Sequence, residues 1–325
     1  MSRTHHHATR STRRLGSRGI TILVGVILSL LVIRPAIAGT AIVVLSSNAA
    51  QYLEAEQAVA EAMAARGHVV QLLCLQSATR EGLKPYLKPG IATFIAIGAE
   101  AAIALRANLP DEFPMTFCMV ADAEGLQLTA ERQAHGVAAE VSFPLQAKLI
   151  AEAMPEARLI GVIYRGQSHS SVQRMHRMRE ALPEGWRLEA IDVDASHSVA
   201  AAIDNLFARD VDVVWAAADA TVYDVATMRA VLLASVRYRT PVFGHSQAFA
   251  QAGALFSVEI DPAAQGRLAA EIAMCLLAGE SLDAPKLTEH IEITLNLTVA
   301  QMLSITFPEQ LLKRADRIIN TDKAR

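Results

Sequence analysis

Polar and acidic side chains follow several of the apolar segments of this chain, where they could contact a small ligand. The residues of this kind are Ser46, Ser47, Gly98, Ala99, Glu100, Asp122, Ser168, Ser170, Ser171, Asp219, Thr221, Ser246 and Glu259. Serines that open helices place free backbone N–H groups where a carboxylate could bind. Asp122, Asp219 and Glu259 could bind an ammonium group. This combination favours a small polar or zwitterionic ligand.

Capping offers a second interpretation of the same residues. Serine and aspartate at a helix start also satisfy the free N–H groups of that helix without any ligand. His245 could contact a ligand, belong to a hinge, or do neither. Both interpretations stay open from the sequence alone.

Motifs of common enzyme classes are absent from the sequence. It has no Gly-x-Ser-x-Gly, no phosphate-loop Gly-Lys-Ser/Thr and no Gly-x-Gly-x-x-Gly. His135, His169, His176 and His197 lack zinc-site spacing, and no cysteine pair supplies one. We therefore expect no catalytic residue, no cofactor and no metal. A hydrolase stays an alternative, because catalytic triads assemble in space and not in sequence.

Short apolar runs alternate with helical stretches along the chain, and this pattern predicts the elements that position these residues. Strands are expected at 40–45, 68–74, 91–97, 115–120, 158–164, 187–193, 211–216, 241–244 and 254–259. Between the first two strands, residues 49–66 carry an apolar stripe at helical spacing, and Gly67 ends that helix. Repeated strand–helix units predict an α/β protein with parallel sheets.

The strand–helix pattern runs twice, from residue 40 to about 138 and from about 158 to 257, which favours two lobes with a cleft. Ligands of open α/β sheets bind beyond the carboxyl ends of the strands. The polar residues above follow those ends.

The N-terminus has the features of a secretory signal peptide. Five arginines precede an apolar run at 19–33, and Ala36 and Ala38 fit a cleavage site before Gly39. An uncleaved membrane anchor is the alternative. Cleavage would place the protein in the periplasm, and Sec and Tat export both stay open.

Charge argues against nucleic acid as a partner. The chain has a formal net charge of −3, and subtracting the six arginines of residues 1–38, a segment without acids, gives −9 for the rest. Phosphate binding needs a basic surface instead. The three cysteines lie in apolar segments and are expected to be buried, unpaired residues.

The C-terminal half carries a family resemblance in the order and spacing of its motifs. These are PVFG at 241–244, AGAL at 252–255, GR at 266–267, LAG at 277–279, LNLTVA at 295–300, PEQLL at 308–312 and RAD at 314–316. The chain resembles the ABC transporter substrate-binding family with the type I periplasmic binding fold, which includes binders of aromatic amino acids.

The resemblance implies two Rossmann-like lobes joined by a hinge of three crossings, at 139–142, 257–261 and 284–290. The first lobe would comprise residues 39–140 and 260–284, and the second 141–259 and 285–325. It implies a monomer that captures a small ligand for an ABC permease and ATPase in the inner membrane. A sensor role at a membrane receptor is the alternative.

Three positions depart from the family pattern. Gly98-Ala99 stands where members commonly have Gly-Thr or Gly-Ser, and Tyr164-Arg165-Gly166 replaces Tyr-Asn-Pro. Ala220 replaces the asparagine of an Asp-Asn-Thr motif, which leaves Asp219 and Thr221. The family's usual ligand contacts are therefore altered here.

Overall fold

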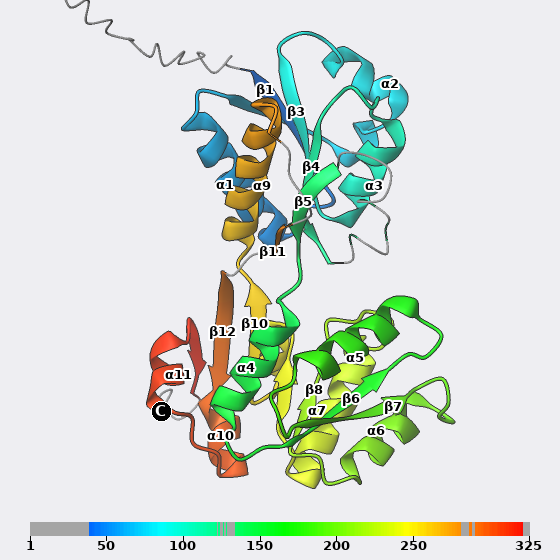
Figure 1. Ribbon diagram of the computed structural model, residues 1–325, viewed down its shortest axis with the longest axis vertical. Coiled ribbons are helices and arrows are strands. Elements are labelled where there is room, and N and C mark those ends of the chain that lie inside the picture. The colour runs from blue at the N-terminus through cyan, green and yellow to red at the C-terminus, as the bar shows by residue number, and fades with distance from the viewer. Residues whose placement is uncertain are drawn as a thin grey trace, which may run out of the picture. The chain divides into compact units, whose positions relative to one another are not determined.

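The computed structural model describes residues 39–320, apart from 122, 124–125, 127, 129–133, 281–285 and 288–289. The predicted signal peptide lies outside these described residues. Within them the chain forms two β-sheets with helices on their faces (Figure 1). No helix in this part of the chain is long and apolar enough to cross a membrane.

The first sheet has six parallel strands in the order β11-β5-β4-β3-β1-β2. Their bounds are β1 Thr40–Leu45, β2 Val69–Leu73, β3 Ile91–Ile97, β4 Met115–Val120, β5 Ala134–Ala138 and β11 Lys286–Leu287. Strand β1 is apolar throughout because both faces of the sheet are covered. Ala41 and Val43 pack under helices α1 (Ala50–Ala64) and α9 (Pro262–Leu277). Ile42 and Val44 pack on the other face against α3 (Ala99–Asn108).

The second sheet has seven strands in the order β13-β12-β10-β9-β8-β6-β7. Their bounds are β6 Leu159–Tyr164, β7 Arg187–Asp192, β8 Val213–Trp215, β9 Val242–Gly244, β10 Phe256–Ile260, β12 Ile291–Asn296 and β13 Arg317–Ile319. All neighbours are parallel except β10 and β12, which run antiparallel. The prediction of parallel sheets is therefore right except at this one pair.

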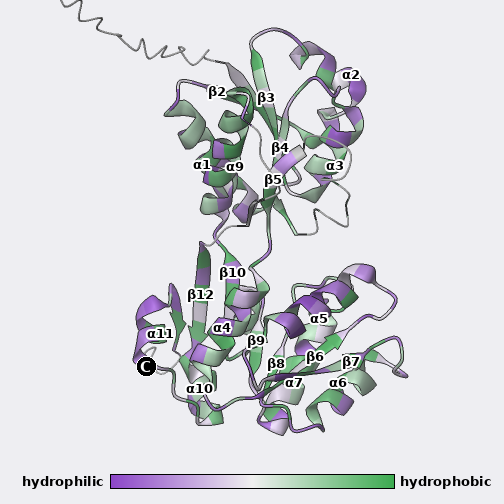
Figure 2. Ribbon diagram, in the orientation of Figure 1, coloured by the Kyte–Doolittle hydropathy of each residue, from purple (hydrophilic) through white to green (hydrophobic). Residues whose placement is uncertain are grey.

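The remaining helices surround the sheets. They are α2 Arg80–Leu83, α4 Phe143–Ala153, α5 His169–Ala181, α6 Val199–Phe207, α7 Val225–Tyr238, α8 Gln247–Ala252, α10 Leu297–Leu303 and α11 Glu309–Arg314. Figure 2 shows hydrophobic residues concentrated along the strands and hydrophilic residues on helices such as α2 and α5. This distribution is that of a layered α/β core.

Helix α9 packs against the first sheet, although it follows β10 of the second sheet in the sequence. It lies beside α1 in Figure 1, and Gly266 permits the contact. A Cβ at Gly266 would lie 2.1 Å from the carbonyl oxygen of Ala55, so no larger residue fits without a shift of α1 or α9.

The chain passes between the sheets three times. It leaves β5 for α4 through residues 139–142, and it returns between β10 and α9 at Asp261. It passes back between β11 and β12. Lys286 and Leu287 had been expected in the second lobe, but they pair with Val137 and Ala138 of the first sheet. Backbone pairing at the free edge of β5 keeps this segment with the first sheet.

Predicted strand bounds agree with the observed ones within two residues. Strands β1, β3 and β4 have the predicted bounds. Strands β5, β11, β12 and β13 were not predicted. β5 is short and contains a glycine and a histidine, and β11 lies within the predicted crossing at 284–290.

Candidate functional site

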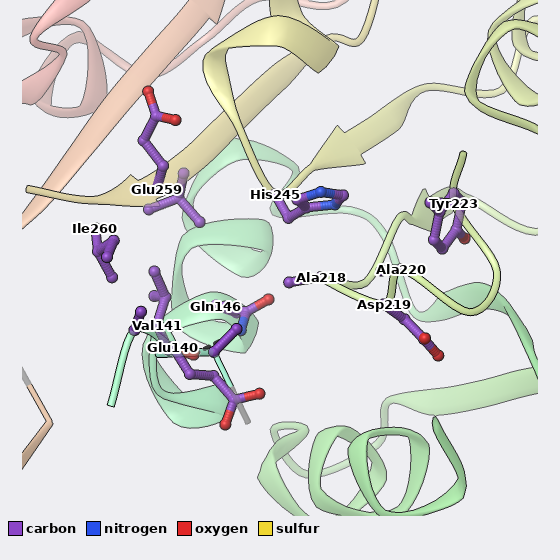
Figure 3. A pocket seen from close by; sticks show the side chains of 13 residues that line it. Glu140, Val141, Gln146, Ala218, Asp219, Ala220, Tyr223, His245, Glu259 and Ile260 are labelled. Atoms are coloured by element: carbon purple, nitrogen blue, oxygen red, sulfur yellow. Dashed lines mark hydrogen bonds between the residues drawn. The ribbon is translucent and has the colours of Figure 1, made fainter. Parts of the chain in front are cut away.

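A cavity of about 360 Å³ lies where β10, the residues after β8 and the connection from β5 to α4 meet (Figure 3). We call it the Asp219 cavity. It is lined by Ala121, Ala139, Glu140, Val141, Gln146, Ala218, Asp219, Ala220, Tyr223, His245, Val258, Glu259 and Ile260. Its volume lies at the small end of the usual range for ligand sites. The predicted residues Asp219 and Glu259 are both among its lining.

Asp219 lies in the loop that follows β8 and is only 4% exposed. Its Oδ1 accepts hydrogen bonds from the backbone N–H of Thr221 at 2.9 Å and from the Thr221 hydroxyl at 2.6 Å. Among the described residues, no lysine or arginine forms an ion pair with it. Ala220, in place of the family's asparagine, leaves this turn intact because the bonds come from Asp219 and Thr221.

His245 follows β9 and stands against the rings of Tyr223 and Phe249. Its Nδ1 lies 3.2 Å from the carbonyl oxygen of Ala216. Burial lowers the pKa of the imidazole below its usual 6.5, against smaller opposing effects that include the charge of Asp219. Tyr223 is buried as well, and burial, reinforced by Asp219, raises its pKa above the usual value.

Glu259, on β10, has its pKa raised chiefly by burial, with a smaller contribution from Glu292. Arg317 lowers that pKa, and its Nη1 lies 3.4 Å from Oε1 of Glu259. Arg317 also forms an ion pair with Glu292. Glu259 therefore shares its cation with a second carboxylate.

Glu140 and Gln146 were not predicted as site residues. Glu140 forms an ion pair of 3.2 Å with Arg174 of α5. Gln146, on α4, donates to the carbonyl oxygen of Val141 at 2.7 Å and accepts from the indole N–H of Trp215 at 2.9 Å. Glu140 lies in the predicted crossing at 139–142, and this position could have identified it as a site residue. Nothing in the sequence marks Gln146.

Arg165 ties three loops at the ends of β6, β7 and β8 together. Its Nη1 lies 2.7 Å from Oδ1 of Asp194, and its Nε donates to the carbonyl oxygen of Thr221 at 2.8 Å. Gly166 donates its N–H to Asp192 at 2.9 Å, and a Cβ there would lie 2.2 Å from the same carboxylate. A proline at position 166 has no N–H and would lose this bond. Arg165 and Gly166 therefore join these loops through contacts that the Asn-Pro of the family pattern could not make in the same way.

Ser46 and Gly98 meet, but in a capping arrangement. The Ser46 hydroxyl accepts from the N–H of Ala101 in the first turn of α3, at 3.0 Å. Gly98 has φ +95°, and a Cβ there would lie 2.5 Å from that hydroxyl. Ala99 and Glu100 form the start of α3.

Ser46 and Ser47 line a second cavity of about 270 Å³, at the ends of β1 and β2. The other residues of that lining are Leu45, Asn48, Leu72, Leu73, Cys74, Leu75 and Gln76. Neither serine is among the residues that line the Asp219 cavity.

The remaining predicted residues that the structure describes lie outside both linings. Ser168 caps α5 through the N–H of Ser171, and Ser170 contacts the Ser168 hydroxyl. Ser171 is buried and accepts from the N–H of Arg165. Ser246 stands at the N-cap of α8 without a side-chain cap bond. Asp122 lies outside the described residues.

The expectation of three buried cysteines is wrong for Cys74. Cys118 is buried and Cys275 partly buried, but Cys74 is exposed, because it follows β2 at the edge of the first sheet. None of the three forms a disulfide bond among the described residues.

Solved structures similar to this one are mostly binding proteins, and their identities are low. A substrate binding protein with adhesive properties from Clostridium difficile, solved ligand-free and open, has a TM-score of 0.72 at 17% identity. The match covers 87% of this chain and 100% of that one. An ABC domain in complex with L-Trp from Streptococcus pneumonia has a TM-score of 0.58 at 20% identity, covering 86% and 100%.

A conserved domain protein from Vibrio cholerae has a TM-score of 0.60 at 22% identity, covering 86% of this chain and 99% of that one. No curated protein matches the sequence. The similarity in fold confirms the prediction of the type I periplasmic binding architecture.

A match of the sequence to a family profile shows which family the chain belongs to. The profile of the family described as "ABC transporter substrate binding protein" matches residues 84–319, which span β3 through β13 and include the whole Asp219 cavity. The cavity lies near the ends of strands β8, β9 and β10, where ligands of open α/β sheets bind. The chain belongs to the ABC transporter substrate binding protein family.

Proposed function

We propose that the chain is the binding subunit of an ABC importer, and not an enzyme. It captures a small polar or zwitterionic, amino-acid-like molecule in the Asp219 cavity. The observation that carries this proposal is Asp219 itself. It is a buried carboxylate on a cavity, without a lysine or arginine ion-pair partner among the described residues. A buried charge needs a compensating partner, and a ligand ammonium group supplies one.

A thermal-shift screen of the purified chain tests this proposal. The panel comprises amino acids, small amines, small carboxylates and sugars. A ligand that binds only the folded state, present at 100 times its Kd, adds about 2.7 kcal/mol to the unfolding free energy. We expect at least one nitrogen-bearing compound to raise Tm. A panel without any shift would contradict the proposal.

Export places this function in the periplasm, beside a permease and ATPase of the inner membrane. Residues 1–38 act as the signal peptide, and the exported protein is a monomer that begins at Gly39. N-terminal sequencing of periplasmic material checks the cleavage site. Recovery of the uncleaved chain in membranes alone would contradict the periplasmic assignment.

Lobe closure accompanies capture. The first lobe comprises residues 39–140 and 260–284, joined there by Lys286 and Leu287, and the rest of the chain from residue 141 forms the second. Three connections make a hinge that permits closing while restricting other motions. Small-angle scattering should show a smaller radius of gyration with a saturating ligand. An identical radius in both states would exclude closure.

A further inference from the structure

The side chains of Gln146 and Tyr223, two of the described residues that line the Asp219 cavity, both donate hydrogen bonds to backbone carbonyl groups. Gln146, a residue that is only 7% exposed, donates one amide N–H to the carbonyl oxygen of Val141. The Tyr223 hydroxyl donates to the carbonyl oxygen of Trp215 at 3.4 Å. Among the described residues, those that line the cavity include no lysine, arginine, serine, threonine or tryptophan.

His245 presents an acceptor rather than a donor. A carbonyl oxygen only accepts, so the contact with Ala216 places the imidazole proton on Nδ1. Burial lowers the pKa of this ring, so it is neutral near pH 7. The other nitrogen, Nε2, is then an unprotonated acceptor.

Three carboxylates complete the polar lining, and all of them accept. Glu140 is paired with Arg174, and Glu259 shares Arg317 with Glu292. Asp219 receives its bonds from Thr221. In Figure 3, the carboxylates of Glu140, Asp219 and Glu259 lie on different sides of the group formed by Gln146, Ala218 and His245.

The rest of the lining is hydrocarbon, from alanine, valine and isoleucine side chains such as Val141, Val258 and Ile260. An ammonium group has three donors and no acceptor, which matches the neighbouring acceptors of Asp219 and His245. A carboxylate has acceptors only. Among the described lining residues it would meet the like charge of three carboxylates, and it would find no cationic side chain there.

From this placement we infer that the Asp219 cavity selects an organic amine that has no carboxylate, with its ammonium beside Asp219 and His245 and its hydrocarbon part against Val141, Val258 and Ile260. This inference rests on the proposed function, because it takes that cavity as the ligand site. It narrows the ligand class from amino-acid-like molecules to small cationic amines.

Matched compounds that share one side chain test the inference by calorimetry at pH 7. One set is tryptamine, tryptophan and indole-3-propionate, and a second is phenethylamine, phenylalanine and 3-phenylpropionate. A third pair, putrescine and ornithine, covers aliphatic amines. We expect the best amine to bind at least tenfold more tightly than its amino acid, and the acids not to bind.

The variant Asp219→Asn provides the second arm. It keeps an oxygen for the two bonds from Thr221, removes one charge and adds an N–H donor. We expect amine affinity to fall at least tenfold and the ratio of amine to amino acid affinity to fall as well. Asp224→Asn is the matched control, because Asp224 caps α7 nearby without lining the cavity. We expect it to bind as the unchanged protein does.

The outcomes separate the two proposals. An amino acid that binds as tightly as its amine, and weakens in Asp219→Asn, overturns the inference and leaves the binding-subunit function standing. Binding of any compound that is equal in Asp219→Asn and the unchanged protein overturns the choice of cavity, and with it the inference. If no compound of the three classes binds, both the inference and the proposed amino-acid-like ligand fall.

Discussion

The ring of His245 donates a hydrogen bond from Nδ1 to the carbonyl oxygen of Ala216, 3.2 Å away. The two residues follow neighbouring parallel strands, β9 and β8, at the same edge of the second sheet. The bond fixes the tautomer of the ring. It thereby makes Nε2 of His245 a hydrogen-bond acceptor in the lining of the Asp219 cavity. Such a fixed tautomer is a common device for orienting a functional histidine.

Burial of His245 predicts a pH dependence of folding stability. Its folded pKa lies below the unfolded value near 6.5, so the unfolded chain binds more protons between the two values. Stability from this group is present above pH 6.5 and is lost as the pH falls toward the folded pKa, by up to about 1.4 kcal/mol for each pH unit.

Urea unfolding at pH 7.5 and pH 5.5 measures this loss. His245→Asn keeps a donor toward Ala216 but does not titrate there, so the loss should shrink. His176→Asn, at an exposed position of α5, should leave it unchanged. Equal pH dependence in His245→Asn and the unchanged protein would show that other groups cause the loss.

Gln146→Leu should destabilise the fold strongly. It removes the acceptor of the Trp215 indole N–H and the donor to Val141, and it leaves both groups buried without partners. Each unsatisfied buried group costs about 1–3 kcal/mol. Urea unfolding should show a loss of that order, whereas Gln301→Leu, on the exposed face of α10, should change stability by under about 0.5 kcal/mol. Equal midpoints in the two variants would exclude a structural role for this amide.

Arg165→Lys should loosen the loop that carries Asp219. Lysine cannot donate to the Thr221 carbonyl and to Asp194 in the forked geometry of arginine. Hydrogen exchange of the Val222 and Tyr223 amides, which bond to the Asp219 carbonyl, should accelerate. Global stability should fall by about 1 kcal/mol at most, because the pair is partly exposed.

A surface pair supplies the control for Arg165. Arg209 pairs with Glu189 away from the cavity, so Arg209→Lys should leave those two amides unchanged. Acceleration in both variants would point to general destabilisation.

The cysteines should differ in reactivity. Cys74 is exposed and should react with a thiol reagent in the native protein. Burial raises the pKa of Cys118 to about 12, so its thiolate is scarce and shielded until the chain unfolds. Labelling followed by peptide mass analysis should find Cys74 modified first and Cys118 only in denaturant. Cys74→Ser should remove the fast phase, and modification of Cys118 in the native state would contradict the burial.

The local pattern of the sequence determined most of the architecture. The apolar runs of β1, β3 and β4 predicted those strands with the observed bounds, because strands covered on both faces must be apolar throughout. The order of strands and helices then predicted α/β layers. The edge strand β11 and its neighbour β5 escaped prediction, since such short strands depend on backbone pairing more than on composition.

Only the tertiary structure decided which residues share the cavity. Asp219 and Glu259 were recognisable as acids after or at the end of a strand, but Ser46 proved to be engaged with α3. Gln146 meets Trp215 across 69 residues of chain, and Glu140 meets Arg174 across 34. Side-chain periodicity encodes which face of an element is buried, whereas the meeting of distant segments depends on how helices and sheets pack. A polar residue at the end of a strand therefore indicates a possible hydrogen bond or ion pair. The packing alone determines whether the partner in that contact is a ligand or the protein itself.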